Sequence, residues 1–258
     1  MYRPNALKQR LAAGKKALGC WLGLNSPIAA EVLALCGYDF LLIDNEHGPA
    51  SLSESIALMQ AMSATPVTSV MRVPWNDPVY LKRALDIGVE AVMIPAIDTR
   101  EQAEQAVRAC RYPPAGFRGS AYQVVRGASY GIGAPDYRET ASDNLLIICQ
   151  IESKRAVDNI EAICAVDGID MLLIGPNDLA GTIGRLGDLE HPEVMALVTR
   201  AEQAIKKSGK KLGSIAFAGR NFQQMFEHGY DLIAASTDMT LMREGALAEV
   251  RAHRQRNG

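Results

Sequence analysis

The chain has 258 residues, of which 48% are apolar and 22% are charged, and its formal net charge is −2. This composition is typical of a globular protein, and the charge is too small to attract nucleic acid or an anionic membrane surface. No run of about 18 apolar residues is present to span a membrane, and the polar N-terminus has no apolar signal core.

A short N-terminal helix is predicted first, and strands and helices then alternate along the chain. Four segments share a Gly, a short acidic step and an apolar run, at residues 37–44, 88–95, 168–175 and 229–236. A Gly that ends a helix and leads into an apolar run is typical of a buried parallel strand. Four further strand-like runs cover residues 17–24, 66–73, 144–152 and 211–218.

Helices are predicted between these strands and after the last one. Their predicted ranges are 27–36, 51–63, 77–87, 99–110, 153–165, 192–208, 219–228 and 238–254. Two of them have clear start signals, Ser26 before Pro27 and Asp77 before Pro78. Eight strand–helix units in a chain of this length predict one (β/α)8 barrel domain over residues 1–258. An open doubly wound sheet is disfavoured because the first strand ends in WLGLNSP, without G-x-G-x-x-G.

Residues 111–144 interrupt this alternation with a long segment that is rich in Gly and Arg and has little periodicity. Long segments of this kind are usually functional or mobile. This one follows a helix, so it begins at the barrel face away from the expected site. The sequence leaves open whether it wraps its own barrel or reaches a neighbouring subunit.

Polar residues collect at the predicted C-terminal ends of several strands, where barrel enzymes carry their chemistry. They are Asp44, Glu46 and His47 after the second strand, Arg72 on the third, Gln150 and Glu152 on the fifth, and Gly175, Pro176, Asn177 and Asp178 after the sixth. We expect these residues to meet at one rim. Trp21 and Ile215, near the ends of the first and seventh strands, are further candidates for substrate contacts.

Glu152 and Asp178 are the candidate metal ligands. Two carboxylates on neighbouring strands form a hard oxygen site of the kind that binds Mg²⁺ or Mn²⁺. The alternative is that each carboxylate caps the helix that follows it. The five cysteines are scattered without a C-x-x-C pair, which favours thiols in a reducing cytoplasm over zinc or disulfides.

Arg72 and His47 are the candidate catalytic side chains. An Arg within an apolar strand needs a partner, which is either an acid such as Asp86 or Glu90 or the anionic group of a substrate. His47 can serve as a general base that Asp44 or Asp86 orients. No Lys lies at a predicted strand end, which disfavours Schiff-base chemistry and favours a metal-assisted enolate.

Five segments, LLIDNEHGP, MRVPWNDPVYLKRALDIG, RYPPAGFRG, QIES and IGPNDLA, occur in this order. In order and spacing they resemble the HpcH/HpaI family of metal-dependent pyruvate aldolases. The resemblance implies a (β/α)8 barrel of the phosphoenolpyruvate/pyruvate superfamily. It also implies a hexamer, a trimer of dimers that exchange the eighth helix, here residues 238–254.

The resemblance further implies the reversible cleavage of a 4-hydroxy-2-oxo acid to an aldehyde and pyruvate or a related 2-oxo acid such as hydroxypyruvate. The implied roles are metal binding (Mg²⁺, Mn²⁺ or Co²⁺) for Glu152 and Asp178, a base at His47 with Asp86 as its partner, oxyanion stabilisation at Arg72, support from Asp44, and Gln150 beside the metal. Asn45 and Gly48 replace the Gly and Ala that are frequent in the family, which leaves the aldehyde open. The rival functions are a lyase or hydrolase for a CoA thioester or a phosphonate, and a non-catalytic barrel that binds a keto acid.

Overall fold

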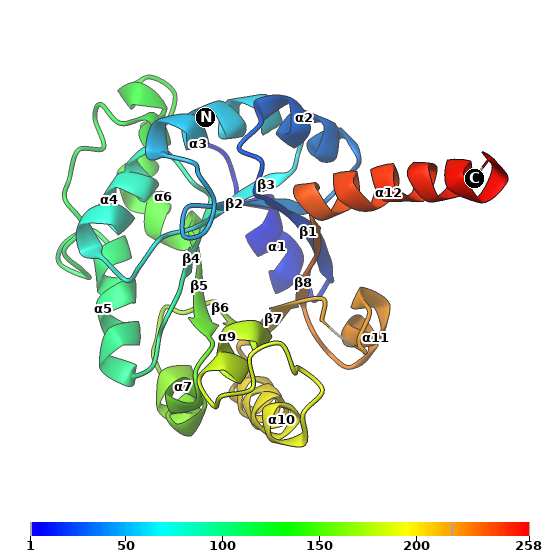
Figure 1. Cartoon of the computed structure of the whole chain (residues 1–258). Helices are drawn as coiled ribbons and strands as arrows, with labels where there is room; N and C mark the ends of the chain where they lie inside the picture. The colour runs from blue at the N-terminus through cyan, green and yellow to red at the C-terminus, as the bar shows by residue number, and fades with distance from the viewer. Residues whose placement is uncertain (1, 218, 258) are drawn as a thin grey trace.

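A computed structural model of the chain describes residues 2–217 and 219–257. Within these residues, eight parallel strands pair in sequence order and close into a barrel, and helices surround it (Figure 1). The strands are β1 (Ala17–Leu22), β2 (Phe40–Asp44), β3 (Thr68–Arg72), β4 (Ala91–Ile94), β5 (Leu146–Ile151), β6 (Met171–Ile174), β7 (Lys211–Ile215) and β8 (Leu232–Thr237). The prediction of a (β/α)8 barrel is confirmed.

The strands alternate between the inside of the barrel and the helical layer, as the two-residue period of a strand requires. Phe40 and Leu42 of β2 belong to the core inside the barrel. Leu41 and Ile43 belong to the core between strands and helices. Asp44 continues the inward row at the end of β2, and it pairs in register with Arg72 of β3. The alternation therefore carries both charged residues to the mouth of the barrel.

The helices begin and end close to the predicted limits. They are α1 (Ala6–Ala12), α2 (Pro27–Leu35), α3 (Leu52–Met62), α4 (Pro78–Asp86), α5 (Arg100–Cys110), α6 (Tyr137–Asn144), α7 (Lys154–Asp158), α8 (Ile160–Cys164), α9 (Pro176–Gly181), α10 (Pro192–Ser208), α11 (Phe222–Glu227) and α12 (Asp238–Asn257). Ser26 and Asp77 cap α2 and α4, as their sequence signals predict. The predicted helix at 153–165 is instead two short helices, α7 and α8, and the short helix α9 was not predicted.

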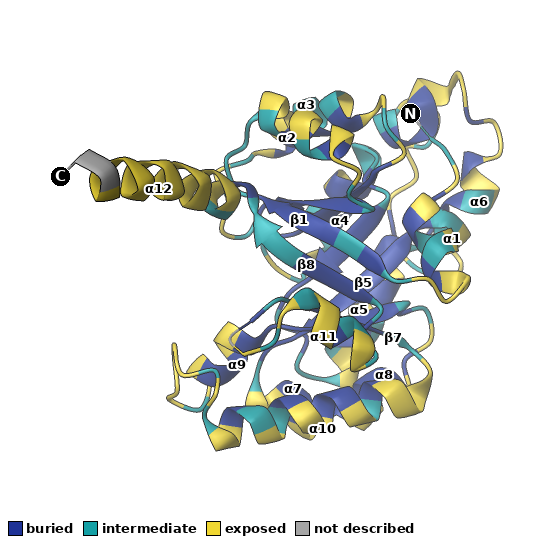
Figure 2. Ribbon diagram, turned by 90° about the vertical axis from the view of Figure 1, so that its right-hand side faces the viewer, coloured by how far each residue is buried: buried dark blue, intermediate teal, exposed yellow. Residues whose placement is uncertain are grey.

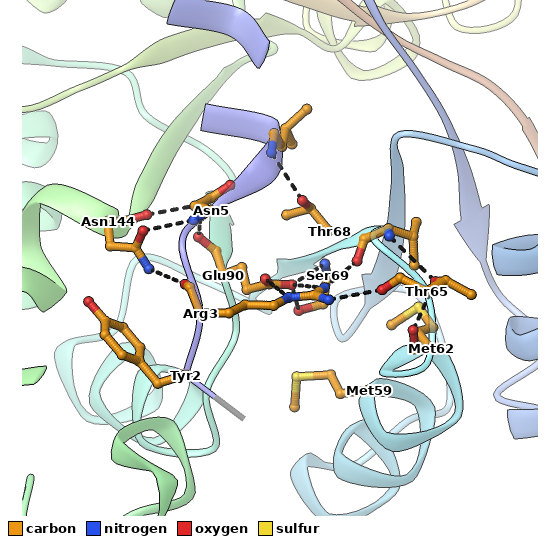
Figure 3. Close-up of polar contacts among 12 residues, drawn as sticks. Tyr2, Arg3, Asn5, Met59, Met62, Thr65, Thr68, Ser69, Glu90 and Asn144 are labelled. Atoms are coloured by element: carbon orange, nitrogen blue, oxygen red, sulfur yellow. Dashed lines mark hydrogen bonds and ion pairs between the residues drawn. The ribbon is translucent and has the colours of Figure 1, made fainter. Parts of the chain in front are cut away.

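The N-terminal segment closes the barrel at the face opposite the strand C-terminal ends. Leu7 and Leu11 of α1 are buried in the core inside the barrel. Arg3 donates to Glu90 over 2.7 Å and to the carbonyl oxygens of Thr65 and Val67 over 2.9 and 2.6 Å. Figure 3 shows this arrangement, with Arg3 lying between Glu90 and Thr65. The N-terminal segment through α1, called the plug below, closes this face and leaves the other face as the open end of the barrel.

Residues 111–144 wrap the barrel of their own chain. Arg118 pairs with Asp86 at the end of α4 over 2.9 Å, and Arg126 donates to the Ile87 carbonyl over 2.8 Å. Ser129 accepts from the N–H of Tyr2 over 3.0 Å. The segment contains a 3₁₀ helix, η1 (Arg126–Gly131), and α6, neither of which its composition predicted. Of the two possibilities that the sequence left open, the structure shows the first.

The last helix, α12, leaves the barrel between α2 and α11 and extends away from it (Figure 1). Figure 2 shows that α12 is exposed over most of its length. Its exposed side chains include Met239, Leu241, Met242, Leu247 and Val250. No helix within the described residues is long and apolar enough to cross a membrane.

Candidate active site

A cavity of about 410 Å³ opens at the C-terminal ends of the strands. All but one of the predicted substrate and metal residues line it: Trp21, Arg72, Gln150, Gly175, Pro176, Asn177, Asp178 and Ile215. Asp44 and His47 line it as well. Glu152 is buried directly beside it, because a β-carbon added to Gly175 would lie 3.0 Å from Glu152 Oε2.

Arg72 is held by two carboxylates from β2 and the turn that follows it. Its Nε and Nη2 donate to Asp44 Oδ1 and Oδ2 over 2.9 and 2.6 Å. Its Nη1 lies 2.9 Å from Glu46 Oε2. Arg72 is 6% exposed, so this paired geometry is what permits a buried charge at the cavity wall.

Asp44 also fixes the turn that brings His47 to the cavity. Its Oδ1 accepts from the backbone N–H groups of Glu46 and His47 over 3.1 and 3.2 Å. Burial alone would raise the pKa of Asp44, but the hydrogen bonds and charge of Arg72 hold it below its ordinary value. Asp44 is therefore an ionised anchor for both catalytic candidates.

Glu152 is bound by a backbone donor just beyond the end of β4. Its Oε1 accepts from the N–H of Ala96 over 2.7 Å, and Ala96 takes the left-handed conformation, with φ 54°, that few non-glycine residues adopt. Burial raises the pKa of Glu152 to about 7; the Ala96 N–H opposes this rise, and the charges of Glu46 and Asp178 add to it.

The capping alternatives for the two metal candidates are wrong. Ser153 caps α7, and its Oγ accepts from the Ala156 N–H over 2.9 Å. Gly175 occupies the N-cap of α9, and Asp178 lies within the first turn of that helix. Both carboxylates are therefore left for another role.

The donor chemistry at this position fits a hard divalent cation. Burial raises the pKa of Glu46, and Asp178 adds to that rise, so negative charges accumulate here. Gln150 Oε1 is buried and has no hydrogen-bond partner among the described residues. Those residues include no group of three or more His, Cys, Asp or Glu side chains placed to hold a metal. Two carboxylates and a free amide oxygen suit a cation that keeps coordination positions open for a substrate.

Within one chain the structure does not bring Asp86 to His47, so the predicted pairing is not formed there. Because α4 begins beyond the C-terminal end of β3 and runs back along the barrel, Asp86 at its last turn lies toward the plugged face. There Arg118 donates to Asp86. Glu90, the other alternative partner of Arg72, is bound by Arg3 at the same face. Neither acid takes part in the cavity of its own chain.

Several cavity residues were missed by sequence reasoning. They are Gly23, Leu173, Ala234, Ala235, Ser236, Thr237, Met239 and Thr240. The repeated Gly–acid–apolar pattern placed Ser236 at a strand end, which was a usable signal for this wall. Glu46 was noticed, but its contact with Arg72 was not predicted.

Comparison with known proteins gives consistent results. The family model described as HpcH/HpaI aldolase/citrate lyase matches residues 17–245. The hydroxypyruvate/pyruvate aldolase of Chromohalobacter salexigens is 41% identical over 237 residues, which make up 92% of this chain and 93% of that protein. The 4-hydroxy-2-oxo-heptane-1,7-dioate aldolase of Klebsiella pneumoniae is 40% identical over 244 residues, covering 95% of this chain and 92% of that one.

Among solved structures, an HpcH/HpaI aldolase/citrate lyase family protein from Burkholderia cenocepacia superposes with a TM-score of 0.93 at 40% identity. The match covers 97% of this chain and 99% of that one. The family model and these relatives extend over nearly the whole barrel, including every strand that borders the cavity. The chain belongs to the HpcH/HpaI aldolase/citrate lyase family.

Proposed function

We propose that this chain is an aldehyde-lyase that reversibly cleaves a 4-hydroxy-2-oxo acid into an aldehyde and pyruvate, or a related 2-oxo acid such as hydroxypyruvate. Family membership and relatives named as aldolases of such acids support the proposal. The observation that carries it is the fixed Arg72 at the cavity wall, beside His47 and the buried carboxylates. This combination can stabilise an oxyanion and move a proton in one place.

Glu152 and Asp178 would hold a divalent cation, Mg²⁺, Mn²⁺ or Co²⁺, with Gln150 beside it. When bound, the cation supplies positive charge that lowers the energy of an enolate. It would also offset the accumulated carboxylates, which otherwise repel an anionic 2-oxo acid.

The residues of the chain then have separate tasks during cleavage. The first N–H groups of α9, around Asn177 and Asp178, have no acceptor within the helix and suit the substrate carboxylate. Arg72 donates to the former ketone oxygen as negative charge develops there. His47 takes the proton of the C4 hydroxyl, the C3–C4 bond breaks, and its electron pair enters the enolate of the 2-oxo acid while C4 leaves as an aldehyde. The enolate then takes a proton at C3, and aldol addition follows the same path in reverse.

Replacing the buried metal candidate tests this proposal. We expect Glu152→Gln to lower kcat/KM for aldol cleavage by more than about 100-fold, since even groups that only orient metal ligands have effects of about 10- to 100-fold. A chelator should act similarly on the wild-type chain. Glu161→Gln is the control, because that carboxylate is exposed and pairs with Arg200 on the outer helices. Full activity in chelator would contradict the metal assignment.

One measurement separates the proposal from its rivals. An enzyme that forms the enolate exchanges the methyl protons of pyruvate with deuterium when metal is added, whereas a barrel that only binds a keto acid does not. A lyase or hydrolase for a CoA thioester or a phosphonate would turn over those substrates instead.

We further propose that the exposed helix α12 packs against a second copy of the chain, within a hexamer built as a trimer of dimers. Ile28, Val32 and Leu35 of α2 are exposed, and α2 lies beside the position where α12 leaves the barrel (Figure 1). Exposed apolar side chains on both helices support an exchanged helix, because apolar surface gathered in this way is typical of protein–protein contacts. The cysteines that the structure describes are free thiols, which supports a reducing cytoplasm.

A further inference from the structure

Trp21 of β1 makes the one described contact with a face of the Arg72 guanidinium. Arg72 Cζ lies 4.4 Å from the centroid of the Trp21 ring. Asp44 holds the Nε and Nη2 edge of the same group, and Glu46 lies at Nη1. The guanidinium is therefore fixed on two sides by charge and on one face by an aromatic ring.

The barrel register explains how a residue on β1 reaches an arginine on β3. Trp21 pairs with Leu42 of β2 and with Thr237 of β8. Leu42 lies two residues before Asp44, which is the register partner of Arg72. Trp21 thus belongs to the inward layer immediately below the Asp44–Arg72 layer, and its large ring extends up beneath the guanidinium. A smaller side chain at position 21 would leave this face open.

The contact with Trp21 restricts a tilt of the Arg72 guanidinium that the Asp44 carboxylate alone does not restrict. A bidentate Arg–carboxylate pair fixes the edge of the guanidinium, but the plane can still tilt about the line joining the two groups. A ring against one face stops that tilt, and cation–π attraction is strongest for Trp and increases when the pair is desolvated. Trp21 is 9% exposed and Arg72 is 6% exposed, so this pair is well shielded from water.

We propose that Trp21 is a positioning residue that fixes the plane of Arg72, so that the N–H groups left free on Nη1 and Nη2 stay directed at the oxygen that becomes negative. The inference rests on the proposed function, in which Arg72 stabilises that oxygen. The positioning role differs from that of a residue that only lines the binding site of the aldehyde, which is called a wall residue here. A wall residue changes KM with the size of the aldehyde, whereas a positioning residue changes the rate of enolate formation even without an aldehyde.

Two substitutions at this position separate these roles. With Mg²⁺ and pyruvate but no aldehyde, we expect Trp21→Leu to lower the maximal rate of methyl proton exchange about 30-fold, which corresponds to about 2 kcal/mol. The KM for pyruvate should change much less. Trp21→Phe, which keeps an aromatic face, should recover most of the rate. Exchange at the wild-type rate in Trp21→Leu, or an equal loss in both variants, would overturn the proposal.

A core substitution and a double variant control for general damage. Phe40 is a fully buried aromatic residue inside the barrel and packs against Gly19 instead of Arg72. Phe40→Leu should lower the melting temperature without the 30-fold loss of rate. Trp21→Leu added to Arg72→Ala should cost no further activity, because Trp21 acts through Arg72. Additive losses in the double variant would contradict that dependence.

A spectroscopic measurement tests the contact without any activity. The chain has two tryptophans, Trp21 and the exposed Trp75. In a Trp75→Phe background the fluorescence reports Trp21 alone, and Arg72→Ala should shift or brighten its emission; unchanged emission would overturn the contact. If the wild-type chain shows no exchange and no aldol activity, the proposed function fails, and the fluorescence result still decides whether Trp21 contacts Arg72.

Discussion

Glu152 is a carboxylic acid whose charge is suppressed by its surroundings. Its pKa is raised from 4.5 to about 7, first by burial and then by neighbouring carboxylates. Because the folded pKa lies above the unfolded one, the unfolded chain releases this proton first as pH rises. Between about pH 4.5 and 7, this group therefore lowers the stability of the metal-free protein with rising pH, and the loss is complete above pH 7.

Metal binding should reverse this dependence of stability on pH, because Glu152 must be deprotonated to bind the metal. We expect Mg²⁺ affinity to fall about tenfold for each pH unit below 7 and binding at pH 6 to release close to one proton. Calorimetric titrations in buffers of different ionisation enthalpy measure both quantities. Glu152→Gln should abolish the proton release. Binding that is equally tight at pH 5.5 and 7.5 would contradict a ligand with this raised pKa.

Gly175 sets the space available to the same carboxylate. A β-carbon there would lie 2.9 Å from Gln150 Nε2 and 3.0 Å from Glu152 Oε2. We expect Gly175→Ala to displace both side chains, to weaken Mg²⁺ binding about tenfold or more, and to cost about 1–3 kcal/mol of stability from overpacking. Metal titration and thermal unfolding measure these effects.

Gly181 offers a matched control on the same helix, α9. A β-carbon at Gly181 would meet only Leu186 Cδ1, at 3.5 Å, which is an ordinary contact. Gly181→Ala should therefore leave metal binding unchanged and raise stability slightly, since Ala favours the helix. Equal metal affinities in the two alanine variants would show that Gly175 does not shape the site.

At the scale of elements, the N-terminal plug completes the barrel. Arg3 joins the segment before α1 to Glu90 ahead of β4 and to two carbonyls ahead of β3. Asn5 N–H adds a hydrogen bond to Asn144 Oδ1 over 2.8 Å, visible in Figure 3. The plug thus links the starts of β3, β4 and β5 to one short segment.

Arg3→Ala should loosen this link. Hydrogen bonds to charged groups contribute about 1.5–3 kcal/mol each, and partial exposure of Arg3 reduces this, so we expect a loss of about 2 kcal/mol and a melting temperature lower by about 4–8 °C. The catalytic rate below the transition should be unchanged. Arg100→Ala is the control, because its pair with Glu104 is exposed on one helix and contributes little to stability. Equal effects of the two substitutions would contradict the linking role.

The elements that could be predicted from the sequence depend on local patterns. The repeated Gly–acid–apolar segments mark strands because a helix cap and a buried strand are both short-range features. The helix N-caps Ser26 and Asp77 could be predicted for the same reason. The six residues of α9 are too few to show periodicity, and η1 and α6 are held by long-range contacts such as that of Ser129 with Tyr2.

The part of the site that could be predicted is the set of polar residues at strand C-terminal ends, because these ends meet at one rim of a barrel. The ion pair between Asp44 and Arg72 needed the β2–β3 register, which no local pattern contains. The role of Asp86 was predicted from a family motif, whereas the direction of α4 decides which face of its own barrel the last turn of that helix reaches. The candidate site residues could therefore be identified from the sequence, but their interaction partners are determined by the tertiary structure.

At the scale of the whole molecule, the barrel is closed and plugged, but the ring of helices around it is incomplete. The position after β8, which a barrel fills with its last helix, is left open because α12 extends outward (Figure 1). Its first turn stays attached, since Asp238 Oδ1 and Oδ2 accept from the N–H groups of Gly23 and Leu24 over 2.9 and 3.0 Å. The open position borders the exposed face of α2. Met239 and Thr240, in the first turn of α12, form part of the cavity wall.

If α12 of one copy covers this position on another, a charge placed on either helix should separate the copies. We expect Val32→Asp on α2 and Leu247→Asp on α12 each to lower the particle mass measured by light scattering, because an unpaired buried carboxylate opposes association. Leu186→Asp, at a leucine beyond α9 that is more exposed than Val32 and Leu247, is the control and should keep the mass of the wild type. A wild-type chain that is monomeric at every concentration would contradict the exchange, as would full assembly of both helix variants.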